Sequence, residues 1–330
     1  MKALVYTGTN TMQFTDAPDP LLASGEVVLA IDAVGICGSD MHAYHGHDPR
    51  RVPPMILGHE FAATIVEGPG KGRRVTGNPL ITCGTCDYCM QGRNNLCSNR
   101  TMVGMTRPGA FAEKMSIPVS SLVDIPQDMS PVQAALTEPA ATALHALNLS
   151  LRALARPLPE CSTLILGGGA IGMLAALLAK SYGCIDLVVA ETNPLRRASI
   201  DRSVGCRTFD PRAGGGPRDA SVDYVIDAVG AKATRNAAFA AVKPGGVIMH
   251  VGLQDWASEI DMRKLTLAEI TLLGTYTYTT SDLRATVRAL YKGVFGDLAW
   301  VEERQLAEGT AAFADLDQGR SAAAKIVLRP

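Results

Sequence analysis

The chain has 330 residues, of which 47% are hydrophobic and 19% are charged, and its formal net charge is −1. A chain of this length is expected to form two domains, because a single hydrophobic core rarely grows past about 250–300 residues. The composition excludes a disordered chain. The near-zero charge excludes the basic surfaces with which proteins bind nucleic acid or anionic membranes.

The N-terminal region shows no signal for export or membrane insertion. Residues 3–6 form a short strand-like run where a secretory signal peptide would carry its apolar core. The longest uncharged apolar stretch, residues 162–179, approaches the length of a membrane span. It contains glycines at positions 167, 168, 169 and 172, so we interpret it as strand, turn and helix. We therefore expect a cytoplasmic protein without a membrane segment.

The first part of the chain, up to about residue 135, is predicted to be a β-rich module. Short strand signals separated by glycine and proline are typical of such modules, and here they lie at 2–6, 26–31, 61–66 and 111–116. The pattern changes after Pro139, where residues 140–154 are predicted to form a helix that Pro157 and Pro159 then interrupt.

From residue 163 onward, strand and helix signals alternate, which predicts a parallel, doubly wound sheet. The stretch 211–217 is rich in glycine and has proline at both ends, so the crossover helix there is expected to be shortened or lost. The last predicted strand, 325–328, is expected to return to the first domain. The predicted strands are 163–166, 187–190, 222–226 and 246–251, and the predicted helices are 170–181, one that begins at Pro194, 233–242 and 282–292.

A glycine-rich turn joins the predicted strand 163–166 to the helix that follows it. The turn matches the pattern G-x-G-x-x-G in the strand-to-helix context that dinucleotide binding requires. Gly167 permits the tight turn, Gly169 lets the backbone approach a pyrophosphate, and Gly172 lets helix and strand pack closely. The N–H groups at the helix start, around Ala170 and Ile171, together with the helix dipole, are expected to hold the phosphates.

An acidic residue follows the second strand of this unit, as expected for a dinucleotide site. Glu191 comes directly after residues 187–190, and a carboxylate there accepts hydrogen bonds from the adenosine ribose and repels a 2′-phosphate. This favours NAD over NADP. Arg196 and Arg197 follow closely and are the alternative, because either could receive a 2′-phosphate.

Four of the eight cysteines lie within residues 83–97, and this clustering predicts a metal site. Cys83, Cys86, Cys89 and Cys97 supply four thiolates from one polar loop, the donor set of a closed, structural zinc site. An iron–sulfur cluster is the competing interpretation. Three of the other cysteines, at 161, 184 and 206, lie in or beside apolar runs and are expected to be inert buried thiols.

Further candidate ligands are scattered along the chain. Cys37 lies in Gly-Ile-Cys-Gly-Ser-Asp, His59 and Glu60 lie in Gly-His-Glu, and Glu138 lies in Thr-Glu-Pro. Taken singly, a cysteine or a histidine of this kind is usually a packing residue, and Glu-Pro usually marks the start of a helix. Their presence together with a dinucleotide motif and a four-cysteine loop points to a second metal centre.

These motifs, in this order, resemble the zinc-dependent medium-chain dehydrogenase/reductase family, and within it the sorbitol and threonine dehydrogenase branch. The resemblance covers essentially the whole chain. It implies an α/β protein with a GroES-like β-rich catalytic domain, residues 1–140 completed by 283–330, and a doubly wound Rossmann domain, residues 141–282. It also implies a homodimer or homotetramer and two zinc ions per chain, one of them structural.

The same resemblance assigns roles to individual residues. The catalytic zinc would be held by Cys37, His59 and an acidic residue, either Glu60 or Glu138. Asp40 would fix the orientation of the His59 ring, and Thr142 would pack near the nicotinamide. Glutamate at position 138 favours the polyol-type branch.

Three departures from the family pattern accompany this resemblance. Ala63 and Arg73 replace a usual glycine and aspartate, and neither touches a proposed ligand. The arginine that sorbitol-type enzymes carry near Thr277 is absent, which counts against sorbitol itself as the substrate.

The expected reaction is oxidation of a secondary alcohol or polyol to a ketone by hydride transfer to NAD(P). Zinc would lower the pKa of the substrate hydroxyl, Ser39 would accept the proton, and His42 would pass it to solvent. His45 and His47 are expected to be surface residues. Sugar alcohols, sugar acids and hydroxy amino acids all fit. The alternatives are a zinc-free quinone or enone reductase and a non-catalytic dinucleotide-binding protein on the same scaffold.

Overall fold

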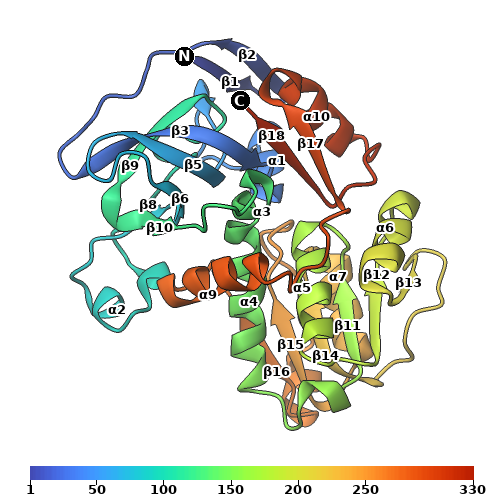
Figure 1. The fold of residues 1–330 in the computed structure, drawn as a ribbon. Helices are drawn as coiled ribbons and strands as arrows, with labels where there is room; N and C mark the ends of the chain where they lie inside the picture. The colour runs from blue at the N-terminus through green and yellow to red at the C-terminus, as the bar shows by residue number, and fades with distance from the viewer.

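The computed structural model describes residues 1–330, and the chain forms two main sheets with helices packed around them (Figure 1). The upper part in Figure 1 is β-rich and holds both chain termini. The lower part contains a parallel sheet between helices. None of the helices combines the length and the apolarity that crossing a bilayer requires.

The β-rich part is built around β3, the long central strand of a seven-stranded sheet. Its order is β10-β6-β5-β3-β18-β17, and β9 also pairs with β3. A three-stranded sheet, β2-β1-β4, lies beside it. The strands are β1 (Lys2–Gly8), β2 (Thr11–Asp16), β3 (Glu26–Gly35), β4 (Met55–Ile56), β5 (Glu60–Glu67), β6 (Arg74–Gly77), β9 (Lys114–Pro118), β10 (Leu122–Asp124), β17 (Val301–Gln305) and β18 (Lys325–Arg329), with the separate pair β7 (Leu80–Ile81) and β8 (Thr101–Met102).

The second large sheet has six strands, all parallel, in the order β13-β12-β11-β14-β15-β16. The order reverses between β11 and β14, and doubly wound folds bind their ligands at such a switch point. The strands are β11 (Thr163–Leu166), β12 (Leu187–Ala190), β13 (Arg207–Phe209), β14 (Val222–Asp227), β15 (Val242–His250) and β16 (Thr271–Gly274).

Apolar residues on both faces of the central strands explain why helices cover both faces of this sheet. On β11, Ile165 packs into the core that contains α4 and α5, whereas its neighbours Leu164 and Leu166 pack into the core that contains α7. Alternate side chains of a strand point to opposite faces, so a continuous apolar run buries both. The doubly wound prediction is confirmed.

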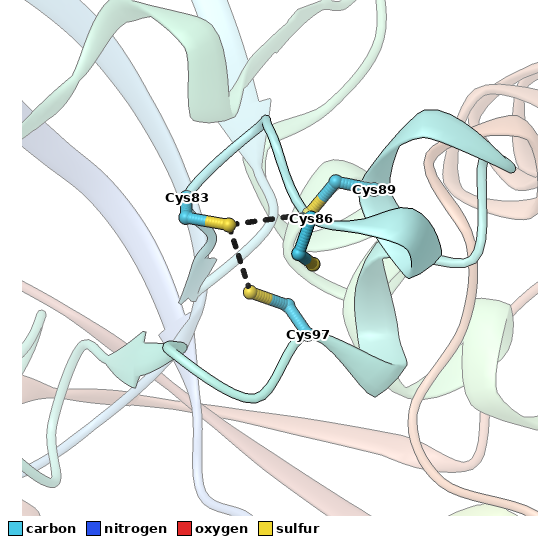
Figure 2. Close-up of side chains that lie close together, drawn as sticks. All are labelled: Cys83, Cys86, Cys89 and Cys97. Carbon is cyan, nitrogen blue, oxygen red and sulfur yellow. Dashed lines mark hydrogen bonds between the residues drawn. The ribbon is translucent and has the colours of Figure 1, made fainter.

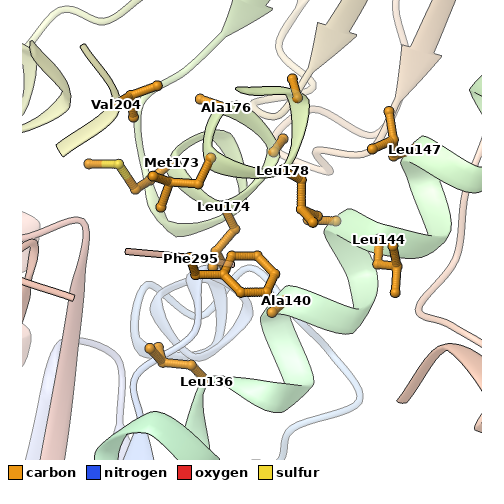
Figure 3. Packing of buried hydrophobic residues seen from close by; sticks show 14 of the residues in the cluster. Leu136, Ala140, Leu144, Leu147, Met173, Leu174, Ala176, Leu178, Val204 and Phe295 are labelled. Atoms are coloured by element: carbon orange, nitrogen blue, oxygen red, sulfur yellow. The ribbon is translucent and has the colours of Figure 1, made fainter. Parts of the chain in front are cut away.

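One hydrophobic core links the two parts of the molecule, because it contains Ala33 of β3 and Ala62 of β5 together with residues of α4 and α5. Figure 3 shows Phe295 of this core between Ala140 of α4 and Leu174 of α5. The helices are α1 (Gly38–Tyr44), α2 (Asp87–Met90), α3 (Pro131–Ala135), α4 (Thr137–Leu151), α5 (Ala170–Ser181), α6 (Pro194–Val204), α7 (Lys232–Ala241), α8 (Met262–Leu267), α9 (Thr280–Tyr291) and α10 (Gly309–Asp317).

The last strand crosses back to the β-rich part. After α9 the chain forms β17, α10 and β18, and β18 pairs antiparallel with β3 through Val327 opposite Gly35 and Leu328 opposite Val34. The domain boundaries at residues 140 and 282 stay a prediction.

The sequence predicted most elements of the parallel sheet to within a few residues, including the absence of a helix between β13 and β14, which the glycines of 211–217 predicted. Two differences from the predicted elements have physical causes. The strand expected at 111–116 begins only at Lys114, because Phe111 is fully buried and its N–H bonds to Leu57. The helix expected from residue 140 begins at Thr137, since a helix tolerates Pro139 in its first turn, where N–H groups have no intrahelical partner.

Candidate active site

Sheet pairing brings Cys37 and His59 together. Gly35 at the end of β3 pairs with Glu60 at the start of β5, so Cys37, two residues beyond β3, lies beside His59, which directly precedes β5. The ligand atoms of Cys37, His59 and Glu60 all lie within 4.8 Å of one another, and the side chains of His59 and Glu60 are buried. Sulfur, imidazole nitrogen and carboxylate oxygen are the donor types that zinc prefers.

Asp40 lies behind His59, as the resemblance implied. Its Oδ1 is 3.6 Å from His59 Nδ1, and its Oδ2 accepts a hydrogen bond of 3.0 Å from the Cys37 backbone N–H. Burial by itself would lower the pKa of His59, but the Asp40 carboxylate and the Cys37 thiol raise it well above its usual value. The Asp40 carboxylate and the Cys37 sulfur thus place negative charge next to this ring.

Lys325 contacts the same group and was not predicted from the sequence. Its Nζ donates to Glu60 Oε2 at 2.6 Å, to Oε1 at 2.8 Å and to the Ile36 carbonyl at 2.8 Å, and both side chains are 1% exposed. The signal that could have revealed it is a single lysine at the start of an otherwise apolar final strand, because a buried lysine needs a partner.

Glu138 lies outside the three-residue group. It is the second residue of α4, and its Oε1 accepts a hydrogen bond of 3.0 Å from the hydroxyl of Tyr278, which is fully buried. Burial raises the pKa of Glu138 to about 7; His59 opposes this effect and the nearby Glu60 carboxylate adds to it. Thr142 follows on α4, one turn later.

The proposed proton relay residues both lie on α1. Ser39 Oγ accepts a hydrogen bond of 3.2 Å from Arg51 Nη2, a contact that the sequence did not suggest. His42 is half-buried, and burial lowers its pKa. No direct hydrogen bond joins Ser39 to His42. Of the two histidines expected at the surface, His47 is exposed, whereas His45 is partly covered and its Nε2 lies 2.7 Å from Asp317.

The four cysteines of the polar loop converge on one point, as Figure 2 shows. Cys83 Sγ lies 3.5 Å from Cys97 Sγ and 4.0 Å from Cys89 Sγ, and all four sulfurs lie within 4.8 Å of one another. The backbone N–H groups of Thr85 and Cys86 lower the pKa of the Cys83 thiol to about 6. The loop thus stabilises a thiolate and presents four sulfurs, which fits a closed tetrahedral zinc site.

The three cysteines predicted to be inert are buried. Cys161, Cys184 and Cys206 are free thiols, and burial raises the pKa of each. A thiol with a raised pKa holds little thiolate at neutral pH and is therefore unreactive.

The glycine-rich turn has the geometry that a close-packed phosphate loop requires. Gly167 has a φ of +96°, and a Cβ on Gly172 would lie only 1.8 Å from the Gly167 carbonyl oxygen. A Cβ on Gly169, in contrast, would meet nothing within 4 Å. Gly169 is the N-cap of α5, so the open space lies in front of a helix N-terminus, where an anion is favoured.

Glu191 closes this turn from the end of β12. Its Oε2 accepts a hydrogen bond of 2.8 Å from the Gly168 N–H, and its Oε1 accepts one of 2.7 Å from the Asn193 N–H. Arg196 Nε lies 3.6 Å from Glu191 Oε2, while Arg197 and Arg212 both donate to the Thr192 carbonyl. The carboxylate and three guanidinium groups therefore gather where the adenosine ribose binds in folds of this type.

Comparisons with known proteins agree with this geometry. The alcohol dehydrogenase GroES-like domain matches residues 23–127, and the zinc-binding dehydrogenase model matches residues 170–292. The chain is 32% identical to L-galactonate-5-dehydrogenase of Escherichia coli K12 over 308 residues, which are 89% of this chain and 88% of that protein. It is 31% identical to L-threonine 3-dehydrogenase of Mesorhizobium japonicum over 294 residues, 84% of this chain and 83% of the other.

A solved structure extends the comparison to the whole fold. A protein of Sinorhizobium meliloti 1021, described as a zinc-binding dehydrogenase and crystallised with NADP, superposes with a TM-score of 0.88. It is 29% identical in sequence, and the match covers 100% of this chain and 99% of the other.

Proposed function

The chain belongs to the zinc-dependent medium-chain dehydrogenases, which oxidise an alcohol or polyol to a ketone with NAD(P), and we propose that Cys37 and His59 hold its catalytic zinc with one carboxylate. The observation that carries this proposal is the convergence of sulfur, nitrogen and oxygen donors within 4.8 Å. Glu60 belongs to that group, and Glu138 lies near it. Comparing the zinc content of Glu60→Gln and Glu138→Gln identifies the third ligand.

The residues around this group would hold and orient the ligands. Asp40 would fix the ring of His59, because a carboxylate on one ring nitrogen directs the other nitrogen toward the metal. Lys325 would restrain Glu60, and Tyr278 would restrain Glu138. Ser39 would take the proton that the substrate hydroxyl loses, and the half-buried His42 would carry it toward solvent.

The two bound groups supply the remaining chemistry. When bound beside Cys37 and His59, zinc would supply a Lewis acid that lowers the pKa of the substrate hydroxyl, and the nicotinamide would supply the hydride acceptor. The open approach to Gly169 and the N-terminus of α5 would hold the pyrophosphate of the dinucleotide.

We also propose that the four-cysteine loop holds a second, structural zinc, so that each chain binds two zinc ions. Four converging sulfurs leave no open coordination position for a substrate. Metal analysis should find two zinc ions per wild-type chain and one per Cys37→Ser chain. Iron in place of zinc would contradict this proposal.

NAD is the cofactor that we propose this enzyme prefers. The support is Glu191, whose carboxylate follows β12 and would repel a 2′-phosphate. The ratio of kcat/KM for the two cofactors tests this point. A preference for NADP would show that Arg196, Arg197 and Arg212 outweigh the carboxylate.

The experiment that tests the enzyme assignment is NADH formation with neutral polyols, sugar acids and hydroxy amino acids. The Cys37→Ser variant should lose about three orders of magnitude or more in kcat, since the metal contributes several kcal/mol to the transition state. Cys206→Ser, which removes a buried thiol far from the site, is the matched control. Near-normal turnover of Cys37→Ser would refute the zinc assignment.

We also propose that the protein forms a homodimer or homotetramer in the cytoplasm. Its support is β16, an edge strand of the parallel sheet, together with exposed apolar side chains on β16 and in the segment between β15 and β16: Leu253, Trp256, Met262, Leu267 and Leu272. Light scattering after size-exclusion chromatography measures the oligomeric state.

A further inference from the structure

A loop directly after α1 carries more positive than negative charge. Asp48 is buried and accepts hydrogen bonds from Arg50 Nε at 2.8 Å and from Arg51 Nη1 at 3.0 Å. Arg51 is also buried, and it donates to the Ser39 carbonyl at 2.9 Å. Two guanidinium groups therefore share one carboxylate, and their contacts tie the loop to the start of α1, next to Cys37.

A third guanidinium group, that of Arg100, lies on an aromatic ring. The Arg100 guanidinium lies 4.8 Å from the centre of the Tyr276 ring and donates to the Cys97 carbonyl at 2.7 Å. No carboxylate pairs with it. Asn95 Nδ2 donates to the Tyr276 carbonyl at 2.9 Å, so the four-cysteine loop holds both the tyrosine and the arginine. In Figure 1 this loop, with α2, lies at the start of α9.

Two chains of contacts lead toward Tyr276 from residues that neighbour the candidate zinc group, Ser39 and Glu138. One runs from Ser39 through Arg51 and Asp48 to Arg50, which is 59% exposed. Arg50 has a raised pKa, mainly because of Asp48 and to a smaller degree because Tyr276 is close. The other chain runs from Glu138 to Tyr278, two residues beyond Tyr276. Arg100 thus stacks on Tyr276, which lies two residues from the tyrosine that contacts Glu138, and Arg50 interacts electrostatically with the same Tyr276.

We infer that Arg100, assisted by Arg50, binds a carboxylate of the substrate, so that the enzyme acts on a hydroxy acid in preference to a neutral polyol. This inference rests on the proposed function of the same site. Arg100 suits the role because stacking on Tyr276 fixes the plane of its guanidinium group. A fixed plane with free N–H groups is the arrangement that binds carboxylates with two parallel hydrogen bonds.

Part of the positive charge on these arginines is not balanced by any carboxylate in the described contacts. Asp48 balances one of the two cations in its loop, and Arg100 contacts only a carbonyl and an aromatic face. An anionic substrate would neutralise this excess, whereas a neutral polyol would leave it in place. Arginine is preferred to lysine at such sites because its planar group makes paired hydrogen bonds.

The test compares substrates that differ only in the carboxylate. Galactonate and galactitol have the same carbon chain, and so do threonine and threoninol. For at least one pair, the wild-type enzyme should show a kcat/KM about 100-fold higher for the acid. Arg100→Met should raise KM for that acid about 10- to 100-fold, as expected for the loss of a charge-assisted contact, and should leave the neutral partner within twofold.

Two further variants control for unfolding and for charge alone. Arg100→Lys should restore part of the affinity for the acid. Arg152→Met, which removes an exposed arginine on α4's C-terminal end, should change neither substrate. A wild-type preference for the neutral partner in both pairs, or an equal effect of Arg100→Met on acid and neutral substrate, overturns the inference.

A failure of the proposed function can be told apart from a failure of the carboxylate site. If no alcohol reduces NAD or NADP, the dehydrogenase proposal fails, and the carboxylate site is then judged by calorimetric titration with galactonate and threonine. Binding of either acid that weakens at least 10-fold in Arg100→Met supports the site. The absence of binding to the wild-type protein, or equal binding to the variant, overturns it.

Discussion

The buried ion pair between Lys325 and Glu60 offers the most direct test of how this site is assembled. We consider Lys325→Met, which keeps the length of the side chain and removes its charge. The lysine Nζ lies 2.6 and 2.8 Å from the two carboxylate oxygens, and neither residue is exposed by more than 2%. Two unit charges about 4 Å apart attract by about 4 kcal/mol at an effective dielectric constant of about 20.

The expected loss in free energy of unfolding is about 3–5 kcal/mol, because removing one partner leaves a buried carboxylate without compensation. Lys325→Met combined with Glu60→Gln should recover at least about 2 kcal/mol, since the double variant leaves no buried charge behind. Lys2→Met is the matched control. Its ion pair with Asp16 is 2.9 Å long but exposed on both sides, so its loss should leave the free energy of unfolding nearly unchanged.

Urea unfolding followed by tryptophan fluorescence measures these differences. Trp300 is 1% exposed and its carbonyl accepts a hydrogen bond from Ala324, next to Lys325, so it reports on this part of the molecule. Trp256 is 83% exposed, and a Trp256→Phe background removes its signal. Metal content is held constant across variants, because bound metal adds to apparent stability. A loss below about 1 kcal/mol in Lys325→Met, or no recovery in the double variant, would refute the reasoning.

Three other changes have definite expected outcomes. The pKa of Asp282 is lowered to about 2 against the effect of burial, mainly by His145. The stability that this carboxylate contributes is therefore present above its unfolded pKa of about 3.9 and is lost as pH falls toward 2. In urea unfolding, Asp282→Asn should cost roughly 1–2 kcal/mol at pH 7, allowing for partial solvent screening, and almost nothing near pH 2. Gly172→Ala should reduce both stability and NADH affinity because its Cβ would collide with the backbone, whereas Gly169→Ala should weaken NADH binding at least 10-fold, measured by fluorescence titration, with an unchanged melting temperature. Cys97→Ser should lower the zinc content by one ion per chain, measured by mass spectrometry, and an unchanged content would contradict the four-cysteine site.

The parallel sheet and the glycine turn show how far sequence patterns reach. The predicted bounds of three elements are the same as the observed ones, because apolar runs, glycines and prolines act on the local backbone. These elements are the strands 163–166 and 187–190 and the helix 170–181. The lost crossover helix after β13 was predicted for the same reason. Element ends were less certain where burial decided them, as at Phe111 and Thr137.

The four-cysteine loop could be predicted from local spacing, whereas the meeting of the scattered ligands depends on the tertiary structure. The loop sulfurs are close in sequence, so their spacing alone predicted that they converge. Cys37 and His59 meet only because β3 and β5 pair in one particular register. Their motifs predicted a shared site through resemblance to a family, and the strand pairing brings them together.

The sequence by itself determined the β-rich and doubly wound parts, the dinucleotide turn and the four-cysteine loop, since each depends on residues that are near one another in the chain. Only the tertiary structure decided that Lys325 reaches Glu60, that Tyr278 reaches Glu138, and that Arg100 lies on Tyr276. These partners are far apart along the chain, and their distances are set by sheet register and helix packing. No local pattern specifies those distances, because they depend on how the whole chain buries its apolar surface.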